Sequence, residues 1–393
     1  MSERPRGARG ASVERLAIDA IAAGGAGVGR LQDGRVAFVP RTAPGDVVEA
    51  RIVDQKRRYV RAESVRLIEG APTRRTAPCP HYARCGGCTI EHLTYDAQLA
   101  AKRQIVEDAL RRIGGIEIDV PRVVASPTET RYRNRVSFSL RRLGTGRVVA
   151  GFHDRVRADR LVDIDGACLL PEQPVADGWD ALRRSWGPDA SRLPSGERLR
   201  LTLRGTYDGA LTLLVEGGYG PGRAAEILAA VPALQSIWHR TDAQVAAVLL
   251  AGVEQVAESW AGEPVRLGGA MFLQVNRGAA HLLEAHVLER VAPVAGQHIV
   301  DAYCGVGLHA RRCARAGARV TGIELDARAV VEARRALGAG TDAEVVEARV
   351  EDVLAVHLPA DVVIVNPPRS GLDAAASGAL TGQPPARVVY VSC

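Results

Sequence analysis

Long apolar runs are missing from this chain of 393 residues. A membrane-spanning helix needs about 18 or more consecutive apolar residues, and no segment reaches that length. The first eleven residues carry the positive charge of a secretory signal but not its apolar stretch. We therefore expect no membrane segment and a cytoplasmic location.

Lysine is almost absent, since Lys56 and Lys102 are the only two. Arginine supplies nearly all of the positive charge, and the formal net charge is +6. This surplus is compatible with a polyanionic partner, although it is small for a chain of this length. An arginine bias can also come from the base composition of a genome, so charge alone permits a nucleic-acid partner without demonstrating one.

The chain also lacks the even number of cysteines that a disulfide framework usually has. The chain has seven cysteines, and three of them fall within ten residues. An odd number of thiols in a cytoplasmic protein favours metal-binding or catalytic roles. The clustered cysteines are Cys79, Cys85 and Cys88, and the others are Cys168, Cys304, Cys313 and Cys393.

Length and patterning predict three regions, because one hydrophobic core rarely serves so long a chain. Residues 12–70 alternate short β-branched runs with glycine-rich turns, which predicts a small OB-like β-barrel. Residues 75–268 are rich in strand-like pieces, with a helix near 95–113 that could pack on the catalytic domain. Residues 269–393 alternate helix and strand, which is typical of a doubly wound, mostly parallel sheet. The predicted fold class is therefore α/β plus β.

A nucleotide-binding pattern stands between a strand and a helix in the last region. Its sequence, "DAYCGVG", contains Gly305 and Gly307, which allow the backbone to approach a ligand, and Glu324 ends the next strand, where a carboxylate can bind ribose hydroxyls. The pattern alone would serve NAD as well. The short Gly-x-Gly, its late position and the later loop 366–369, "NPPR", favour S-adenosylmethionine.

The segment "CPHYARCGGC" brings three thiols onto one compact turn with glycines between them. Such a turn supplies three corners of an iron–sulfur site, and Cys168 in "DIDGACLL" is the best fourth ligand. A structural zinc site is the alternative for the cluster, and a buried free thiol is the alternative for Cys168. Cys313 lies on a predicted helix face and is assigned to the core.

Several motifs together resemble one family. "CPHYARCGGC", "YRNRVSFSLR", "GFHDRVRADRLVDIDGACLL", "FLQVN", "DAYCGVG", "NPPRSGL" and "VVYVSC" occur in the order seen in RNA uridine-5-methyltransferases, in the branch with a TRAM domain and a 4Fe–4S cluster. The resemblance implies a nucleophile at Cys393. It implies cluster ligands at Cys79, Cys85, Cys88 and Cys168. It implies S-adenosylmethionine contacts from Gln274, Tyr303, Gly305, Gly307, Glu324 and Asn366.

By the same resemblance, the chain transfers a methyl group from S-adenosylmethionine to carbon 5 of a uridine in structured RNA, through a covalent cysteine–uracil intermediate. Ribosomal RNA is the favoured substrate, transfer RNA is the alternative, and we expect a monomer. Three departures matter: Asn366 stands where the family usually has Asp, Leu308 where it has Asn, and the sequence stops at Cys393. The glutamate that serves as base is expected beyond that residue, so the chain is a fragment or cannot complete the reaction.

Rival functions remain open. An Asn-Pro-Pro loop also occurs in amino-methyltransferases, but they place an aromatic residue where Arg369 stands. A 5-methylcytidine enzyme would tend to have cysteine at the position of Pro368. The third rival is an RNA-binding protein whose methyltransferase fold has lost its activity.

Overall fold

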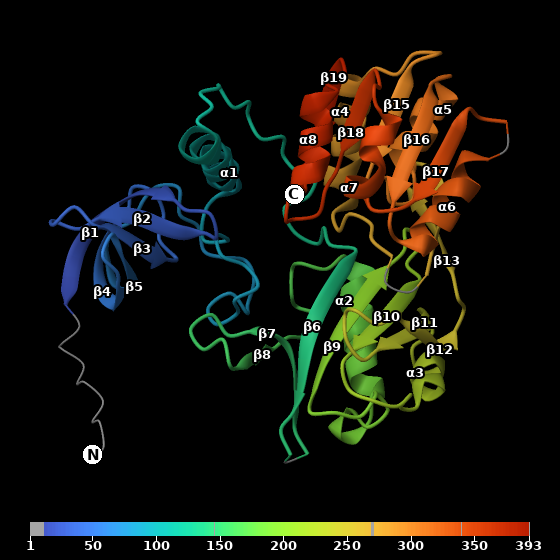
Figure 1. Cartoon of the computed structure of the whole chain (residues 1–393). Coiled ribbons are helices and arrows are strands. Elements are labelled where there is room, and N and C mark those ends of the chain that lie inside the picture. Colours follow the sequence, from blue (N-terminus) through green and yellow to red (C-terminus); the bar gives the residue numbers. More distant parts are fainter. Residues whose placement is uncertain (1–11, 145, 269–270, 339, 393) are drawn as a thin grey trace, which may run out of the picture. The chain divides into compact units, whose positions relative to one another are not determined.

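The computed structural model describes residues 12–144, 146–268, 271–338 and 340–392 (Figure 1). The chain divides into two compact units. The first comprises Met1–Glu129 and Val149–Cys168, and the second comprises Thr130–Val148 and Leu169–Cys393. Within the described ranges, no helix is long and apolar enough to cross a membrane.

The N-terminal alternation produces the closed five-stranded barrel that the sequence predicts, in the order β1-β2-β3-β5-β4. In β1, Leu16 and Ile18 point into the core while Ala17 between them is exposed, as period-two patterning requires. Val48, Ala50 and Val60 complete the same core from the neighbouring strands. The strands are β1 (Val13–Ile21), β2 (Ala26–Arg30), β3 (Val36–Pro40), β4 (Val47–Gln55) and β5 (Tyr59–Glu69).

The predicted helix near 95–113 is present as α1 (Tyr95–Ala109), which continues into a π-helical turn, Leu110–Gly114. It ends at Gly115, whose φ of 65° is left-handed, as is common after a helix. Ala101 of α1 shares a buried cluster with Ile21 of the barrel. The first unit also contains the antiparallel hairpin of β7 (Val148–His153) and β8 (Leu161–Asp163).

A β-rich sheet, the central sheet of the second unit, has its strands in the order β12-β11-β10-β9-β6. Phe138 of this sheet stacks on Trp179 of helix α2 at 4.1 Å between ring centroids, so α2 covers one face. A separate hairpin, β13 with β14, follows. The strands are β6 (Arg135–Arg142), β9 (Arg198–Gly205), β10 (Leu211–Glu216), β11 (Leu234–Arg240), β12 (Val248–Gly252), β13 (Val256–Trp260) and β14 (Glu263–Leu267). The helices are α2 (Gln173–Ser185), a 3-10 turn (Pro188–Ala190) and α3 (Ala224–Ala230).

The C-terminal part is the predicted doubly wound sheet, with five parallel strands in the order β17-β16-β15-β18-β19. Alternate residues of the strands belong to two buried clusters, one on each face of the sheet. Ile299 and Ile364 pack on the side of α4, α5 and α6, whereas Val300 and Val363 pack on the side of α7 and α8. The strands are β15 (His298–Ala302), β16 (Arg319–Glu324), β17 (Ala343–Glu347), β18 (Val362–Val365) and β19 (Arg387–Tyr390). The helices are α4 (Arg277–Val291), α5 (Leu308–Arg315), α6 (Ala327–Leu337), α7 (Val350–Val353) with a 3-10 turn (Leu354–His357), and α8 (Ala374–Gly382).

The strand order reverses between β15 and β18. In open parallel sheets, ligands bind at the carboxyl ends of the strands at this switch point. The fold therefore directs attention to the residues that follow Ala302 and Val365.

Candidate active site

The glycine turn after β15 has the backbone of a ligand-binding loop. Tyr303, Gly305 and Gly307 all have positive φ, at 62°, 55° and 77°. A Cβ added at Gly305 would meet no atom within 4 Å, whereas one at Gly307 would lie 2.9 Å from the Cβ of Ala333 on α6. Gly305 thus leaves open space above the turn, and Gly307 allows the turn to pack closely on α6.

Glu324 ends β16 and lies against this turn. Its Oε2 accepts a hydrogen bond from the N–H of Gly305 at 2.9 Å, and its Oε1 accepts from the N–H groups of Leu325 and Asp326 at 2.8 Å each. A carboxylate has about four lone-pair sites, so these bonds leave capacity for ribose hydroxyls. The backbone bonds orient Glu324 toward the turn.

Asn366 follows β18 on the other side of the switch point. Its N–H donates to the carbonyl of Ala302 at 3.3 Å, which fixes it next to the start of the turn. Burial raises the pKa of the Tyr303 hydroxyl, and Glu351, Asp373 and Tyr390 lie close enough to raise it further. Tyr303 and Asn366 therefore share the carboxyl edge of the sheet.

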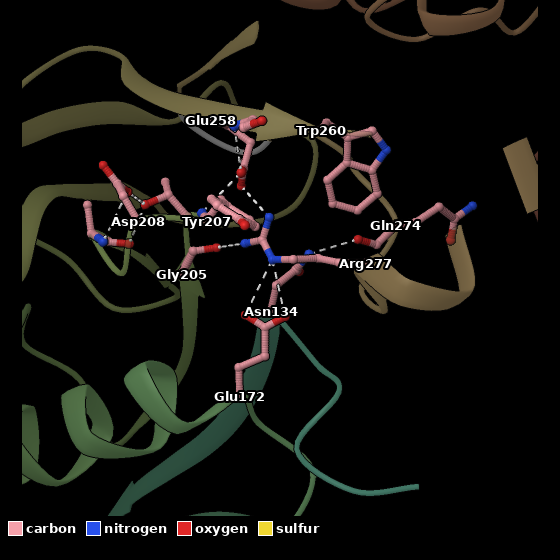
Figure 2. A network of polar contacts seen from close by, with 12 residues as sticks. Asn134, Glu172, Gly205, Tyr207, Asp208, Glu258, Trp260, Gln274 and Arg277 are labelled. Atoms are coloured by element: carbon pink, nitrogen blue, oxygen red, sulfur yellow. Dashed lines mark hydrogen bonds and ion pairs between the residues drawn. The ribbon is translucent and has the colours of Figure 1, made fainter. Parts of the chain in front are cut away.

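Gln274 lies in the segment that precedes α4. Its carbonyl accepts from the Nδ2 of Asn134 at 3.0 Å, and the carbonyl of Val275 accepts from the N–H of Asn134 at 2.8 Å. Leu273 shares a buried cluster with Val306 of the glycine turn. This packing places the Gln274 segment against the turn, and Figure 2 shows the Gln274 side-chain amide directed away from the contacts of Arg277.

Arg277 makes a buried contact network that sequence reasoning did not anticipate (Figure 2). Its Nη1 lies 2.8 Å from Oε2 of Glu258, its Nε donates to Oε1 of Glu172 at 3.1 Å, and its Nη2 donates to the carbonyl of Gly205 at 2.5 Å. The first turn of α4 is thereby tied to strand β13 and to the central sheet. The sequence offered only the charge of Arg277 itself, because its partners are distant in the chain.

Asp301 is a second residue whose position sequence reasoning did not anticipate. It is fully buried at the end of β15, and its Oδ2 accepts from the N–H of Ala310 at 3.0 Å. Burial raises the pKa of Asp301 to about 7, and the charge of Glu324 adds to this effect. Its Oδ1 has no hydrogen-bond partner among the described residues.

Two isolated cysteines of the second unit are buried. Cys313 is completely inaccessible in the core, as predicted. Burial raises the pKa of the Cys304 thiol well above its ordinary value, with Asp301 and Glu324 acting in the same direction. A neutral, buried thiol is a poor nucleophile, so neither cysteine suits covalent catalysis.

The clustered cysteines lie in the first unit with Cys168. Burial raises the pKa of Cys88 to about 12, and Glu91, Cys168, Cys79 and Cys85 contribute in that order, so the other three thiols lie within electrostatic reach of Cys88. Cys85 forms a β-bridge with Asp154, which joins the cysteine turn to the β7–β8 hairpin. Among the described residues, no group of three or more His, Cys, Asp or Glu side chains is arranged as a metal site.

The cysteine turn is also fastened to the barrel and to the loop before Cys168. Arg41 donates to the carbonyls of Tyr82 and Cys85 at 2.5 and 3.1 Å, and His81 contacts Asp165 at 2.9 Å. A Cβ at Gly87 would lie 3.1 Å from the ring of Phe152. A larger residue there would press against Phe152, so the turn is closely packed at this position.

Cys393, the predicted nucleophile, lies outside the described residues. The strand that precedes it is described: Tyr390 of β19 is paired with Val365, and the N–H of Val391 donates to the carbonyl of Val365 at 2.8 Å. The chain after β19 therefore starts beside the chain after β18, where Asn366 lies.

Comparisons with known proteins agree with this arrangement. Residues 11–65 match the TRAM domain family, and residues 299–373 match a methyltransferase domain family. An uncharacterized RNA methyltransferase of Gloeobacter violaceus is 33% identical, over 96% of this chain and 86% of the relative. A 23S rRNA (uracil(1939)-C(5))-methyltransferase of Azoarcus sp. is 30% identical, over 96% of this chain and 89% of the relative.

A solved structure resembles almost the whole chain. It is the tRNA (uracil-54, C5)-methyltransferase of Pyrococcus abyssi in complex with S-adenosyl-L-homocysteine, with a TM-score of 0.72 and 26% identity, covering 97% of this chain and 90% of that chain. The similarity therefore extends over both the barrel and the doubly wound sheet of this chain. The chain belongs to the family of S-adenosylmethionine-dependent RNA uracil-5-methyltransferases.

Proposed function

We propose that this enzyme methylates carbon 5 of a uridine in structured ribosomal RNA. The observation that carries the proposal is the similarity, along nearly the entire chain, to a 23S rRNA uracil-C5 methyltransferase. The glycine turn, Glu324 and Asn366 at one sheet edge support it, because they are the residues expected to bind the methyl donor. Transfer RNA is the second candidate substrate, since the solved relative acts on tRNA.

The reaction needs a nucleophile because carbon 5 of uracil is not reactive enough by itself. We assign this role to Cys393: its thiolate would form a bond to carbon 6, and the displaced electron pair would increase the electron density at carbon 5. The donor's sulfonium supplies an electrophilic methyl group, which carbon 5 takes. A base would then remove the proton from carbon 5 so that the thiolate leaves.

In the same proposal, Gln274, Tyr303, Gly305, Gly307, Glu324 and Asn366 bind the donor. Gly305 supports this assignment because its turn leaves space that a side chain would occupy. Glu324 would accept hydrogen bonds from the ribose, and Asn366 would offer an amide where the family usually has a carboxylate.

We further propose that Cys79, Cys85, Cys88 and Cys168 hold a 4Fe–4S cluster. A donor set of four thiols within electrostatic reach suits such a cluster, and coordination would stabilise thiolates that burial disfavours. The role assigned to the cluster is structural, because the cysteine turn and the glycine turn belong to different units.

The function is tested with the complete gene product, labelled methyl donor and two unmethylated RNAs, 23S rRNA and tRNA. Label in 5-methyluridine of rRNA, lost in Cys393→Ala and retained in Cys304→Ala, is the expected result. Label in tRNA alone would replace rRNA as the substrate. Donor binding without transfer to either RNA would contradict the enzymatic proposal and favour an RNA-binding protein.

The cluster is tested by anaerobic purification followed by iron and sulfide analysis. We expect about four of each per chain. Cys168→Ser is expected to lose iron, whereas Cys313→Ser, at a buried position of the second unit, is expected to keep it. Zinc in place of iron, or equal iron in both variants, would contradict the assignment.

A further inference from the structure

The central sheet of the second unit has one apolar and one polar face. Phe138 of β6 and Leu203 of β9 belong to the apolar face, which α2 covers. The alternate residues point to the other side: Ser137 of β6 hydrogen-bonds across to Thr202 of β9 at 2.7 Å. Polar side chains therefore line the face opposite α2.

A pocket of about 170 Å³ opens on this polar face. Four arginines and a single carboxylate contribute to its wall, so it carries a surplus of positive charge. The lining residues with ionisable side chains are Arg135, Arg200, Arg204, Arg240 and Glu216.

Glu216 is already engaged by two of these arginines. Its Oε1 accepts from Arg240 at 2.5 Å, and its Oε2 lies 3.5 Å from Arg200. Because one carboxylate carries one negative charge, the Glu216 group does not neutralise even these two guanidinium groups. Arg135 and Arg204 share carboxylates that are already engaged: Glu216 acts on Arg135, and Glu258, which is ion-paired with Arg277, acts on Arg204.

Arg135 and Arg204 are direct cross-strand neighbours on β6 and β9. Like charges in this position are destabilising unless an anion lies between them. Arg204 is only 7% exposed, and burial lowers the pKa of its guanidinium to about 9. Its Nη2 donates to the carbonyl of Met271 at 2.5 Å, and within the described ranges neither arginine forms an ion pair with a carboxylate.

We propose that this pocket binds a phosphodiester group of the RNA substrate. Planar guanidinium groups bind phosphate oxygens with paired hydrogen bonds, and partial burial strengthens such bonds. The ring of Phe272 helps to orient Arg135 for this contact, since the guanidinium carbon lies 5.7 Å from the ring centre. The inference rests on the proposed function, because it takes RNA to be the substrate.

The test compares two variants of equal charge loss. Arg135→Gln combined with Arg200→Gln removes two pocket arginines but leaves the buried Arg204 in place. The control combines Arg183→Gln with Arg184→Gln, on α2, the helix that covers the opposite face. Circular dichroism and donor affinity, which should match the unmodified enzyme, identify any variant that fails to fold.

Affinity for 23S rRNA is then measured at several salt concentrations. The pocket variant is expected to bind about tenfold or more weakly than the unmodified enzyme, because charge-assisted hydrogen bonds are lost. Its slope of log affinity against log salt should decrease by about 1 relative to the control. Equal affinity and slope in the pocket variant and the α2 variant would overturn the proposal.

Two further outcomes separate the possible failures. Calorimetric titration with inorganic phosphate tests for a small anion: a pocket variant that loses phosphate binding but retains RNA binding would also overturn the assignment to RNA. If the unmodified enzyme itself does not bind RNA, the proposed function fails with it. If the unmodified enzyme binds RNA and the pocket variant binds it equally well, only the assignment of the pocket fails and the proposed function stands.

Discussion

The guanidinium of Arg277 lies 2.8 Å from the carboxylate of Glu258, whose side chain is only 1% exposed. This ion pair joins the first turn of α4 to strand β13. Gln274 lies three residues before Arg277, and Asn134 holds its carbonyl. The buried pair therefore stabilises the segment that carries one of the expected donor contacts.

Replacing Arg277 by Met is expected to destabilise the protein by about 3–5 kcal/mol, because Glu258 would remain buried without its partner. Under conditions where the variant is folded, donor affinity should also decrease, since the Gln274 segment loses an anchor. Urea unfolding measures the first effect, and equilibrium donor binding measures the second.

Arg290→Met provides a matched control on the same helix. Arg290 pairs with Glu289 at 2.9 Å, and both side chains are more than half exposed. Such surface pairs contribute about 0–1 kcal/mol, so this variant should unfold almost as the unmodified protein does. Equal unfolding midpoints for the Arg277 and Arg290 variants would show that the buried network does not stabilise the fold.

Gly305 and Gly307 of the glycine turn give a second prediction. Both have positive φ, so alanine at either position costs about 1 kcal/mol or more in backbone strain. Gly307→Ala adds a contact with Ala333 and should lose about 1–3 kcal/mol more. Gly305→Ala should stay the more stable of the two yet bind donor about tenfold or more weakly, because its methyl group enters the open space.

Differential scanning calorimetry and donor titration distinguish these effects. A Gly305→Ala enzyme with unchanged donor affinity would argue against a ligand above that turn. A Gly307→Ala enzyme as stable as Gly305→Ala would contradict the packing role of Gly307.

Local patterns made the fold predictable. Alternation in "VSFSLRR" identified β6, and the sequence from "HIVDAYC" to "VTGIEL" identified two adjacent parallel strands with Gly305 and Glu324 at their carboxyl ends. In both cases the signal lies within a few residues of the element it predicts. Neighbouring parallel strands then bring the two motifs together without any long-range information.

The buried polar contacts could not be predicted in the same way. Arg277 meets Glu172, Glu258 and Gly205, which lie far from it in sequence. A single arginine in a helix usually indicates a solvated face. The sequence likewise did not indicate that Asp301 would be completely buried, since its burial depends on what packs above the end of β15.

Removal of the proposed cluster gives a third prediction. Without a metal, Cys88 is a neutral thiol at physiological pH, because burial and nearby negative groups raise its pKa to about 12. Anaerobic treatment with a chelator should therefore loosen the cysteine turn and make the first unit more sensitive to limited proteolysis. Donor affinity of the second unit should change by less than about twofold, because its turn contains none of the four cysteines. Identical digestion before and after treatment would argue against a structural cluster.

Asp301 gives a pH-dependent prediction. Burial raises its pKa from 3.8 to about 7, so the folded protein holds this proton more tightly than the unfolded chain does. The stability that this group contributes is complete below pH 4 or so and is lost as the pH rises through about 7. The difference is on the order of 4 kcal/mol, since each pKa unit corresponds to about 1.4 kcal/mol. Asp301→Asn removes the titration while keeping an oxygen for the N–H of Ala310.

Urea unfolding at pH 5.5 and pH 8.5 measures the part of this effect between those values, on the order of 2 kcal/mol, because most of the loss above pH 5.5 is complete near pH 7. Relative to the unmodified protein, Asp301→Asn should gain stability between the two pH values, and the gain should follow the titration of one group. Asp326→Asn is the control: Asp326 caps α6 through the N–H groups of Arg328 and Ala329, and asparagine caps a helix equally well. That variant should keep the pH dependence of the unmodified protein. If the Asp301 and Asp326 variants show the same dependence, the buried carboxyl group is not what makes the stability fall with rising pH.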